Sequence, residues 1–308
     1  MHLSSRIFVT GHRGLVGSAL MRALQQEGFT RLLTRTREDL DLRNQAAVDS
    51  FFAETKPEYV FIAAAKIGGI LANNNFPADF IGQNLSIQTN LIESSYRHGV
   101  TKLLFVSSSC IYPKLAPQPL KEEYLLTGPL EPTNEWHAVA KIAGIKMLQA
   151  YRLQFGFQGI TLMSTNLYGP GDNFHPEHSH VLPGLMRRLH EAKLVGTPAV
   201  VIWGTGTPLR EFLHVDDLAN AAIFLMRTYD GRDIINVGTG TDISIRELAS
   251  SVARVVGYTG ELQFDPTKPD GTPRKLMDVS RIAALGWKSR IPLEDGLRST
   301  YEWFLRRY

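Results

Sequence analysis

The stretch VTGHRGLVGSAL, residues 9–20, decides the fold of this chain. It places Gly11, Gly14 and Gly17 in the spacing G-x-x-G-x-x-G, directly after an apolar run and at the start of an amphipathic stretch. Glycine has no Cβ atom, so the turn can tighten and a pyrophosphate can approach the N–H groups at the helix start. In a first strand–helix unit this spacing predicts a dinucleotide-binding loop, and a plain tight turn is the alternative.

Short apolar runs and longer amphipathic stretches alternate through the first half of the chain. Strands of four to seven residues followed by helices of ten to twenty are typical of a parallel, doubly wound sheet. We therefore predict an α/β Rossmann fold with a second, smaller α/β lobe. The alternation fails near residue 171, so we assign residues 1–170 and about 211–240 to the NADP-binding Rossmann domain. A discontinuous substrate-binding lobe takes about 171–210 and 241–308.

The composition is that of a globular protein, with 44% hydrophobic and 20% charged residues in a chain of 308. The net charge of +3 is small and dispersed, so we expect no nucleic-acid partner. The single cysteine, Cys110, excludes an internal disulfide and fits a reducing compartment. The start of the chain lacks an apolar leader, and no run reaches the ~18 apolar residues of a membrane span. We expect a cytoplasmic protein with no membrane partner and no metal site.

Arginines gather where the cofactor's adenosine ribose is expected. Arg35 and Arg37 follow the second predicted strand, and Arg13 lies inside the glycine loop. Guanidinium groups suit a ribose 2′-phosphate, so we predict NADP, although solvated surface arginines are the alternative. Because acids follow closely, NAD is not excluded, and Asp41 with Leu42 is expected against the adenine.

The stretch NEWHAVAK, residues 134–141, places His137 and Lys141 one turn apart on a helix predicted from Asn134 to Phe155. Ser107, Ser108 and Ser109 end the preceding strand. The pattern resembles short-chain dehydrogenases, in which a tyrosine donates a proton to the carbonyl oxygen. There a lysine lowers the pKa of the tyrosine, and a serine binds the same oxygen. Histidine stands in the tyrosine's place, and a polar helix residue without a chemical task is the alternative.

Longer stretches extend this resemblance over most of the chain, among them GHRGLVGSA, AAAKIGGI, SSSCIYPK, TNLYGPGDNFHPEHSHVLP, WGTGTPLREFLHVDD and KPDGTPRK. They resemble the GDP-L-fucose synthases, 3,5-epimerase-4-reductases of the extended short-chain dehydrogenase/reductase family. The resemblance implies NADPH-dependent conversion of GDP-4-keto-6-deoxy-D-mannose to GDP-L-fucose, by C3 and C5 epimerisation and then C4 reduction. It also implies a homodimer formed through the helix from Asp79 to His98 and the helix bearing Lys141.

The resemblance assigns roles to individual residues. Cys110 and His180 match the acid/base pair of the family, although a small buried thiol and a loop histidine are the plainer alternatives. The catalytic set is then Ser108, Cys110, His137, Lys141 and His180. The implied cofactor contacts are Gly11, Arg13, Gly14, Gly17, Arg37, Asp41, Leu42, Ser107, Lys141, Asn166, Leu167 and His180. The implied GDP-sugar contacts are Arg188, Trp203, Arg210 and Asp270.

His137 departs from the family pattern. Three explanations are open. The tyrosine was replaced deliberately, the chain is a natural homologue that has lost or weakened reduction, or the histidine transfers the proton itself. The imidazole is shorter than a phenol, and Lys141 keeps it neutral, so we expect C4 reduction to be weaker by about 10²–10⁴-fold. Two other functions stay open. The chain could be another extended-family sugar-nucleotide epimerase or dehydratase, or a catalytically dead nucleotide-sugar or NADP binding protein.

Overall fold

A computed structural model of the chain describes residues 1–268 and 270–308. Its main element is a six-stranded parallel sheet of order β2-β1-β3-β4-β5-β9. The strands are β1 (Ile7–Thr10), β2 (Leu32–Leu33), β3 (Tyr59–Ile62), β4 (Lys102–Ser108), β5 (Gly159–Ser164) and β9 (Ile235–Val237). Because most of these strands are buried on both faces, they are apolar runs in the sequence. The predicted doubly wound Rossmann fold is confirmed.

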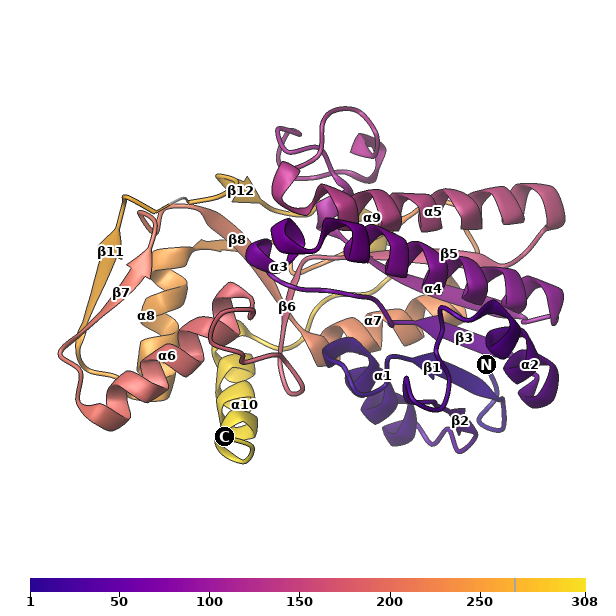
Figure 1. The fold of residues 1–308 in the computed structure, drawn as a ribbon, viewed down its shortest axis with the longest axis horizontal. Helices are drawn as coiled ribbons and strands as arrows, with labels where there is room; N and C mark the ends of the chain where they lie inside the picture. The colour runs from indigo at the N-terminus through magenta and orange to yellow at the C-terminus, as the bar shows by residue number, and fades with distance from the viewer. Residues whose placement is uncertain (269) are drawn as a thin grey trace.

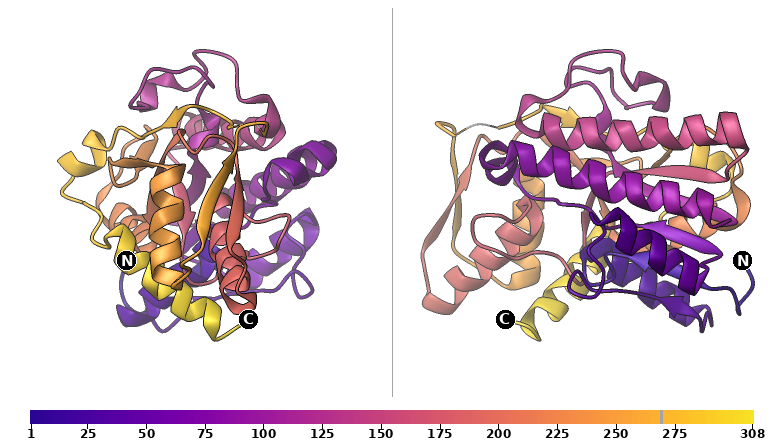
Figure 2. Two further views of the ribbon diagram at one scale, coloured as in Figure 1. Left: turned by 90° about the vertical axis from the view of Figure 1, so that its left-hand side faces the viewer. Right: turned by 45° about the vertical axis from the view of Figure 1, so that its right-hand side comes forward.

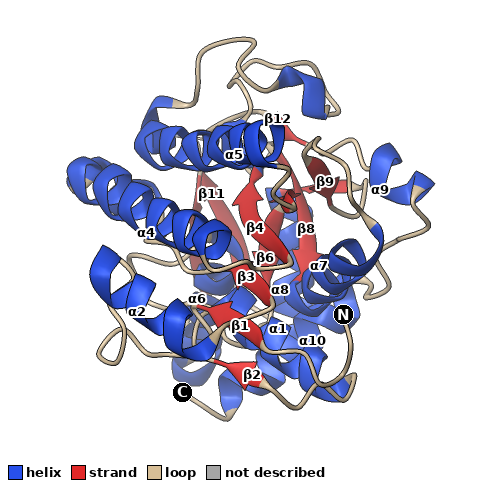
Figure 3. Ribbon diagram, turned by 90° about the vertical axis from the view of Figure 1, so that its right-hand side faces the viewer, coloured by secondary structure: helices blue, strands red, loops and turns tan. Residues whose placement is uncertain are grey.

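Helices cover both faces of this sheet (Figure 3). One face packs on α1 (Leu15–Gln26) and α7 (Val215–Thr228), whose buried side chains share a core cluster with β1 and β5. The other face packs on α2 (Gln45–Thr55), α4 (Pro77–Arg97) and α5 (Glu135–Phe155). The helices α4 and α5 run side by side in the right-hand view of Figure 2. Every face that the parallel sheet presents is therefore buried under a helix layer.

A second lobe lies beside the sheet (Figure 1). Its strands are β6 (Asn166–Tyr168), β8 (Leu209–His214), β10 (Asp242–Ser244) and β12 (Arg274–Lys275), with a separate pair of β7 (Ala199–Trp203) and β11 (Glu261–Asp265). Its helices are α6 (Val181–Val195), α8 (Ile245–Val256) and α10 (Leu293–Leu305), which share a third core cluster. The short helices α3 (Ile70–Asn75) and α9 (Ser280–Ala284) belong to the connections.

The chain crosses between the two lobes more than once. It leaves the main sheet after β5, forms β6 against β8, and later returns to the main sheet as β9. The proposed boundary residues of the two domains stay a prediction. The strand order reverses between β1 and β3, so a crevice is expected at the carboxyl edge of these strands. No helix of the described residues is long and apolar enough to cross a membrane.

Candidate active site

The glycine loop after β1 packs closely against the protein's own backbone. Gly11 has φ +67°, and a Cβ atom there would lie 2.9 Å from the Cα atom of Ala64. A Cβ atom on Gly17 would lie 2.1 Å from the carbonyl oxygen of Gly11, so only glycine permits this close packing. Gly14 forms the N-cap of α1 without a side chain to block the free N–H groups. This bare helix start fits a pyrophosphate.

The arginines around the loop differ in what they contact. Arg35 lies over the ring of Phe51, with 5.0 Å between the guanidinium carbon and the ring centroid. Arg13 and Arg37 are exposed, and neither forms an ion pair with any described residue. These two cations fit a 2′-phosphate at the end of β2.

The predicted adenine contacts have partners of their own. Asp41 pairs with Arg43 at 2.6 Å, and hydrogen bonds from Arg43 lower the pKa of Asp41 to about 2. Leu42 packs half-buried against the core under α2 and α4, and its carbonyl oxygen accepts a hydrogen bond from Asn90. Asp41 is therefore ionised and paired with Arg43. Leu42 supplies the apolar surface beside it that an adenine ring could contact.

The first turns of α5 carry His137 and Lys141. Burial, with a further contribution from the charge of Lys141, lowers the pKa of His137 to about 3. Burial also lowers the pKa of Lys141 to about 8. The Lys141 Nζ donates to the carbonyl oxygen of Val106 at 2.9 Å and lies 4.5 Å from the centroid of the Phe105 ring. At neutral pH the imidazole is therefore uncharged and the lysine largely protonated.

The serine run brings Cys110 to the end of β4. The Ser108 Oγ donates to the Cys110 Sγ at 3.0 Å, and Ser108 caps the 3₁₀ turn Ser109–Ile111 that carries the thiol. Burial raises the pKa of Cys110, and the positive charges of Lys275 and Lys141 oppose that rise. The buried Ser107 Oγ has no hydrogen-bond partner among the described residues. A group at the carboxyl edge of the sheet can therefore bind this hydroxyl.

His180 precedes the first residue of α6. Part of the residue is exposed to solvent. Protein atoms around the imidazole nevertheless lower its pKa by desolvation. Its charge acts on the pKa of His137, so the two rings are within electrostatic reach. The rings of His175 and His178 stack on each other, with 4.6 Å between their centroids. Within the described part of the chain, no three His, Cys, Asp or Glu side chains are placed to hold a metal ion.

Asn166 and Leu167 belong to β6, the first strand of the second lobe. The Asn166 Nδ2 donates to the carbonyl oxygen of Glu211 at 2.8 Å, and Leu167 packs half-buried against the core under α1 and α7. Both residues lie at the junction of the two sheets, because β6 pairs with β8 directly after the chain leaves β5.

Arg210 on β8 lies opposite Lys275 on β12 in the strand register. Burial lowers the pKa of Lys275, and the charge of Arg210 lowers it further. The charge of Asp270 raises the pKa of Arg210, so the two side chains lie near each other. The Asp270 carboxylate also accepts hydrogen bonds from the backbone N–H and the hydroxyl of Thr205, at 2.7 and 2.8 Å. The site therefore holds two partly desolvated cations beside one another, an arrangement that fits a diphosphate.

Arg188 on α6 and Trp203 at the end of β7 are the other two predicted substrate contacts. The Trp203 side chain is 66% exposed, with the Lys268 Nζ 5.7 Å from its ring centroid, and Arg188 donates to the carbonyl oxygen of Val201. An exposed indole face can stack on a purine base.

A line of charged and titratable groups joins most of the catalytic and substrate residues predicted from the sequence. The charges of His180 and Lys141 act on the pKa of His137, and those of Lys141 and Lys275 act on the pKa of Cys110. The charge of Arg210 acts on the pKa of Lys275, and that of Asp270 acts on the pKa of Arg210. The glycine loop, Arg188 and Trp203 are not on this line.

The sequence prediction omitted two residues of this site, Lys275 and Asn84. The side chain of Asn84 on α4 contacts His137. Asn84 carried no local signal, because an asparagine in a polar helix is a common surface residue. Lys275 ends the matched stretch KPDGTPRK, but nothing in that stretch predicts that its side chain is partly buried beside Arg210. Only the register of β12 with β8 and the packing of α4 on α5 bring them to the site.

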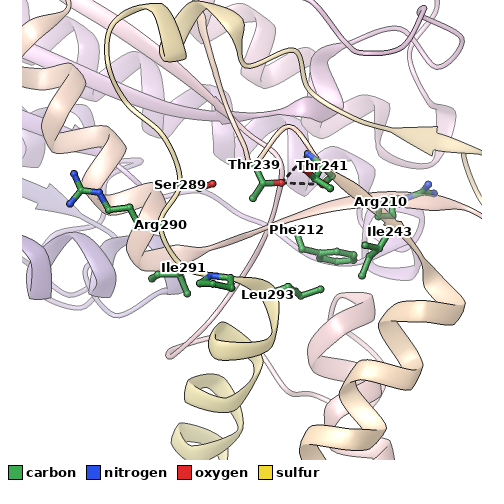
Figure 4. A pocket seen from close by; sticks show the side chains of 10 residues that line it. Arg210, Phe212, Thr239, Thr241, Ile243, Ser289, Arg290, Ile291 and Leu293 are labelled. Carbon is green, nitrogen blue, oxygen red and sulfur yellow. Dashed lines mark hydrogen bonds between the residues drawn. The ribbon is translucent and has the colours of Figure 1, made fainter.

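A cavity of about 340 Å³ lies where β8 and β10 meet the segment before α10 (Figure 4). It is lined by Arg210, Phe212, Thr239, Thr241, Ile243, Ser289, Arg290, Ile291, Pro292 and Leu293. Arg210 is the only predicted site residue among these. Figure 4 shows its guanidinium directed away from Phe212 and Leu293, so the predicted substrate contacts do not converge in this cavity.

Comparisons with known proteins agree with one another. Residues 7–238 match the NAD dependent epimerase/dehydratase family. The chain is 64% identical over 303 residues to GDP-L-fucose synthase 1 of Arabidopsis thaliana, a match covering 98% of this chain and 94% of that protein. It is 56% identical over 309 residues to GDP-L-fucose synthase of Escherichia coli, covering 97% and 96%. The structure of a GDP-mannoheptose C4 reductase from Campylobacter jejuni with NADP bound is 44% identical, with TM-score 0.93 and 99% of each chain covered.

Proposed function

The chain belongs to the NAD dependent epimerase/dehydratase family, within which it groups with the GDP-L-fucose synthases, and from this premise we propose its reaction. It converts GDP-4-keto-6-deoxy-D-mannose to GDP-L-fucose in two stages, epimerisation at C3 and C5 followed by reduction at C4. The cofactor is NADP, and NADPH when bound supplies the hydride for C4. The observation that carries the proposal is the geometry at the end of β4, where Ser108 is hydrogen-bonded to Cys110 at 3.0 Å and Lys141 to the carbonyl oxygen of Val106 at 2.9 Å. The pairing of Lys275 with Arg210 in the strand register adds two cations suited to a diphosphate.

Epimerisation needs a base on one face of the sugar and an acid on the other. Protons at C3 and C5 are acidic because the C4 carbonyl can hold the negative charge of an enolate. Cys110 and His180 carry these proton transfers in our proposal. The raised pKa of Cys110 makes it a thiol at neutral pH, and the lowered pKa of His180 makes it a neutral imidazole. The thiol can therefore donate a proton and the imidazole can accept one.

Reduction needs a proton on the C4 oxygen as the hydride reaches the carbon. Ser108 at the end of β4 is proposed to hydrogen-bond that oxygen, and Lys141 to hold the nicotinamide ribose. His137 stands where the proton donor is expected, and its pKa of about 3 leaves it almost entirely neutral at pH 7. Neutral imidazole is a poor proton donor. We therefore propose that this chain epimerises its substrate and reduces it slowly.

The GDP group is assigned to the second lobe. Arg210 and Lys275 are proposed to bind the diphosphate, and Asp270 the sugar or the guanine. Trp203 can stack on the guanine, with Arg188 beside it. The 66% exposure of Trp203 supports this role, because an indole serving only as core packing would be buried.

We also propose a homodimer and a cytoplasmic location. Exposed apolar side chains on α5 support the dimer, since Trp136, Val139 and Leu153 are 43%, 37% and 85% exposed. A second copy packing its α4 and α5 on this face would cover them. Light scattering coupled to size-exclusion chromatography decides this, and a monomer at micromolar concentration would exclude the dimer.

The proposed reaction is tested by incubating the chain with GDP-4-keto-6-deoxy-D-mannose and either NADPH or NADH. We expect slow oxidation of NADPH, still slower oxidation of NADH, and GDP-L-fucose as the product. Preferential use of NADH, or tightly held NAD with no net oxidation, would favour another sugar-nucleotide epimerase or dehydratase. Tight binding of both ligands without turnover, not rescued by His137→Tyr, would favour a binding protein.

A further inference from the structure

Glu211 on β8 is a fully buried carboxylate where the two lobes meet, with 0% of the residue exposed. Its Oε1 accepts from the backbone N–H groups of Thr239 and Gly240 at 2.6 and 2.7 Å, and its Oε2 accepts from the backbone N–H of Met277 at 2.9 Å. A buried carboxylate is costly unless its oxygens are hydrogen-bonded, and these three N–H groups satisfy both oxygens. Glu211 therefore ties β8 to the loop after β9 and to the residues after β12.

The ladder that joins β12 to β8 is short. It spans two residue pairs, one of which sets Lys275 opposite Arg210. The N–H of Met277, two residues past Lys275, continues this connection to β8 through the Glu211 side chain. Leu120 pairs through its backbone with the other edge of the same segment. Loss of the Glu211 hydrogen bond should therefore loosen β12 on the β8 side without detaching the segment from the protein.

Gly238 leaves the space that the carboxylate fills. A Cβ atom on Gly238 would lie 2.2 Å from the Glu211 Oε1, which is too close for both atoms to keep their places. Burial raises the pKa of Glu211, and the hydrogen bonds from the three N–H groups oppose that rise. A methyl group at position 238 would therefore displace the carboxylate while leaving its chemistry unchanged.

We propose that Glu211 is a positioning residue that holds β12 in register with β8, so that Lys275 lies beside Arg210 to bind the diphosphate of the substrate. Glu211 itself does not touch the substrate, because its side chain is buried and successive side chains of a strand point to opposite faces, which places Arg210 on the other one. The role toward the diphosphate rests on the proposed function, whereas the hold on β12 is a property of the free protein.

The substitution Glu211→Gln separates the two ties. A glutamine amide has one acceptor oxygen and one donor NH₂ group. If the oxygen faces Thr239 and Gly240, the NH₂ group faces the N–H of Met277, and only that hydrogen bond is lost. The reversed amide would lose the other two, so the first orientation costs less. Glu211→Gln should therefore release β12 and keep the loop after β9.

Hydrogen–deuterium exchange, followed by mass spectrometry of overlapping peptides, measures the hold on β12, and calorimetric titration with GDP measures the diphosphate site. In Glu211→Gln we expect the Met277 amide to exchange about 10–100-fold faster and the Kd for GDP to rise about 10–100-fold, since a hydrogen bond to a charged group is lost in each case. The Kd for NADPH should not change, because the glycine loop has no contact with β12 or Glu211.

Two further variants support the comparison. Gly238→Ala keeps the charge of Glu211 and should shift Met277 exchange and GDP affinity in the same direction. Asp217→Asn is the matched control, because Asp217 is a buried carboxylate whose Oδ2 accepts from the backbone N–H groups of Arg290 and Ile291, away from β12. An amide oxygen can keep both hydrogen bonds, so this variant should leave both quantities unchanged.

Fast exchange of the Met277 amide in the unsubstituted chain would overturn the proposal, even if neither Glu211→Gln nor Gly238→Ala folded. A folded Glu211→Gln protein with an unchanged Kd for GDP would overturn it as well, and so would equal losses of GDP and NADPH affinity, which indicate general damage. If the unsubstituted chain bound no GDP while Glu211→Gln still accelerated Met277 exchange, the proposed function would be defeated and the hold on β12 would stand.

Discussion

Replacing His137 with tyrosine should restore C4 reduction. With a pKa of about 3, only about one His137 in 10⁴ carries the imidazolium proton at pH 7. If that minor form delivers the proton, the deficit is at most about 10⁴-fold, or about 5 kcal/mol of barrier. General acid catalysis is worth about 10²–10⁴-fold, so His137→Tyr should increase kcat for NADPH oxidation within that range.

The assay follows NADPH absorbance at saturating GDP-4-keto-6-deoxy-D-mannose from pH 6 to pH 8. The unsubstituted chain should slow about tenfold for each unit of rising pH, because the protonated fraction of His137 falls by that factor. His137→Tyr should be faster throughout and should lose this slope below pH 7. NADPH affinity, measured by fluorescence titration, serves as the control and should not change. An equal rate in both proteins, with cofactor bound equally, would refute the assignment of His137 to proton transfer.

Three further substitutions test other parts of the site and the fold. Gly17→Ala would place a Cβ atom 2.1 Å from the Gly11 oxygen, so kcat/KM should fall about 100-fold, whereas Gly82→Ala has open space and should not change it. Arg37→Ala should weaken NADPH binding about 10–100-fold in a fluorescence titration and leave NADH binding unchanged, and equal losses for both would argue against a 2′-phosphate contact. Burial raises the pKa of Asp172 from 3.8 to about 7, so the folded chain holds this proton after the unfolded chain has lost it. The free energy of unfolding should therefore drop by about 4 kcal/mol as pH rises from about 4 to about 7. Urea unfolding of Asp172→Asn should lack that drop, and an identical pH dependence in both proteins would contradict it.

The fold could be predicted because its strongest signals are local. Buried parallel strands give apolar runs, and the helices between them are long. The helix predicted from Asp79 to His98 is observed as Pro77–Arg97, a difference of two residues at one end and one at the other. The second helix is predicted to begin at Asn134. It occupies the N-cap position of α5, but its side chain makes no capping hydrogen bond and its buried Oδ1 has no partner among the described residues.

The site was less predictable because it is assembled from distant segments. His137 and Lys141 are one helical turn apart, so their spacing was visible in the sequence. Asn84 reaches His137 only through the packing of α4 on α5. Lys275 reaches Cys110 only because β12 pairs with β8. The electrostatic character of the site also depends on burial, which makes His137 neutral and raises the pKa of Cys110.

Turnover in heavy water with unlabelled NADPH tests most directly whether one site performs both stages. We predict that mass spectrometry and NMR of the reduced GDP-sugar will find deuterium at C3 and C5 and protium at C4. Replacing Cys110 with serine or His180 with asparagine should remove deuterium from at least one of the two carbons. A reduced product that carries protium at both C3 and C5 would contradict the assignment of epimerisation to this chain and leave it a simple C4 reductase.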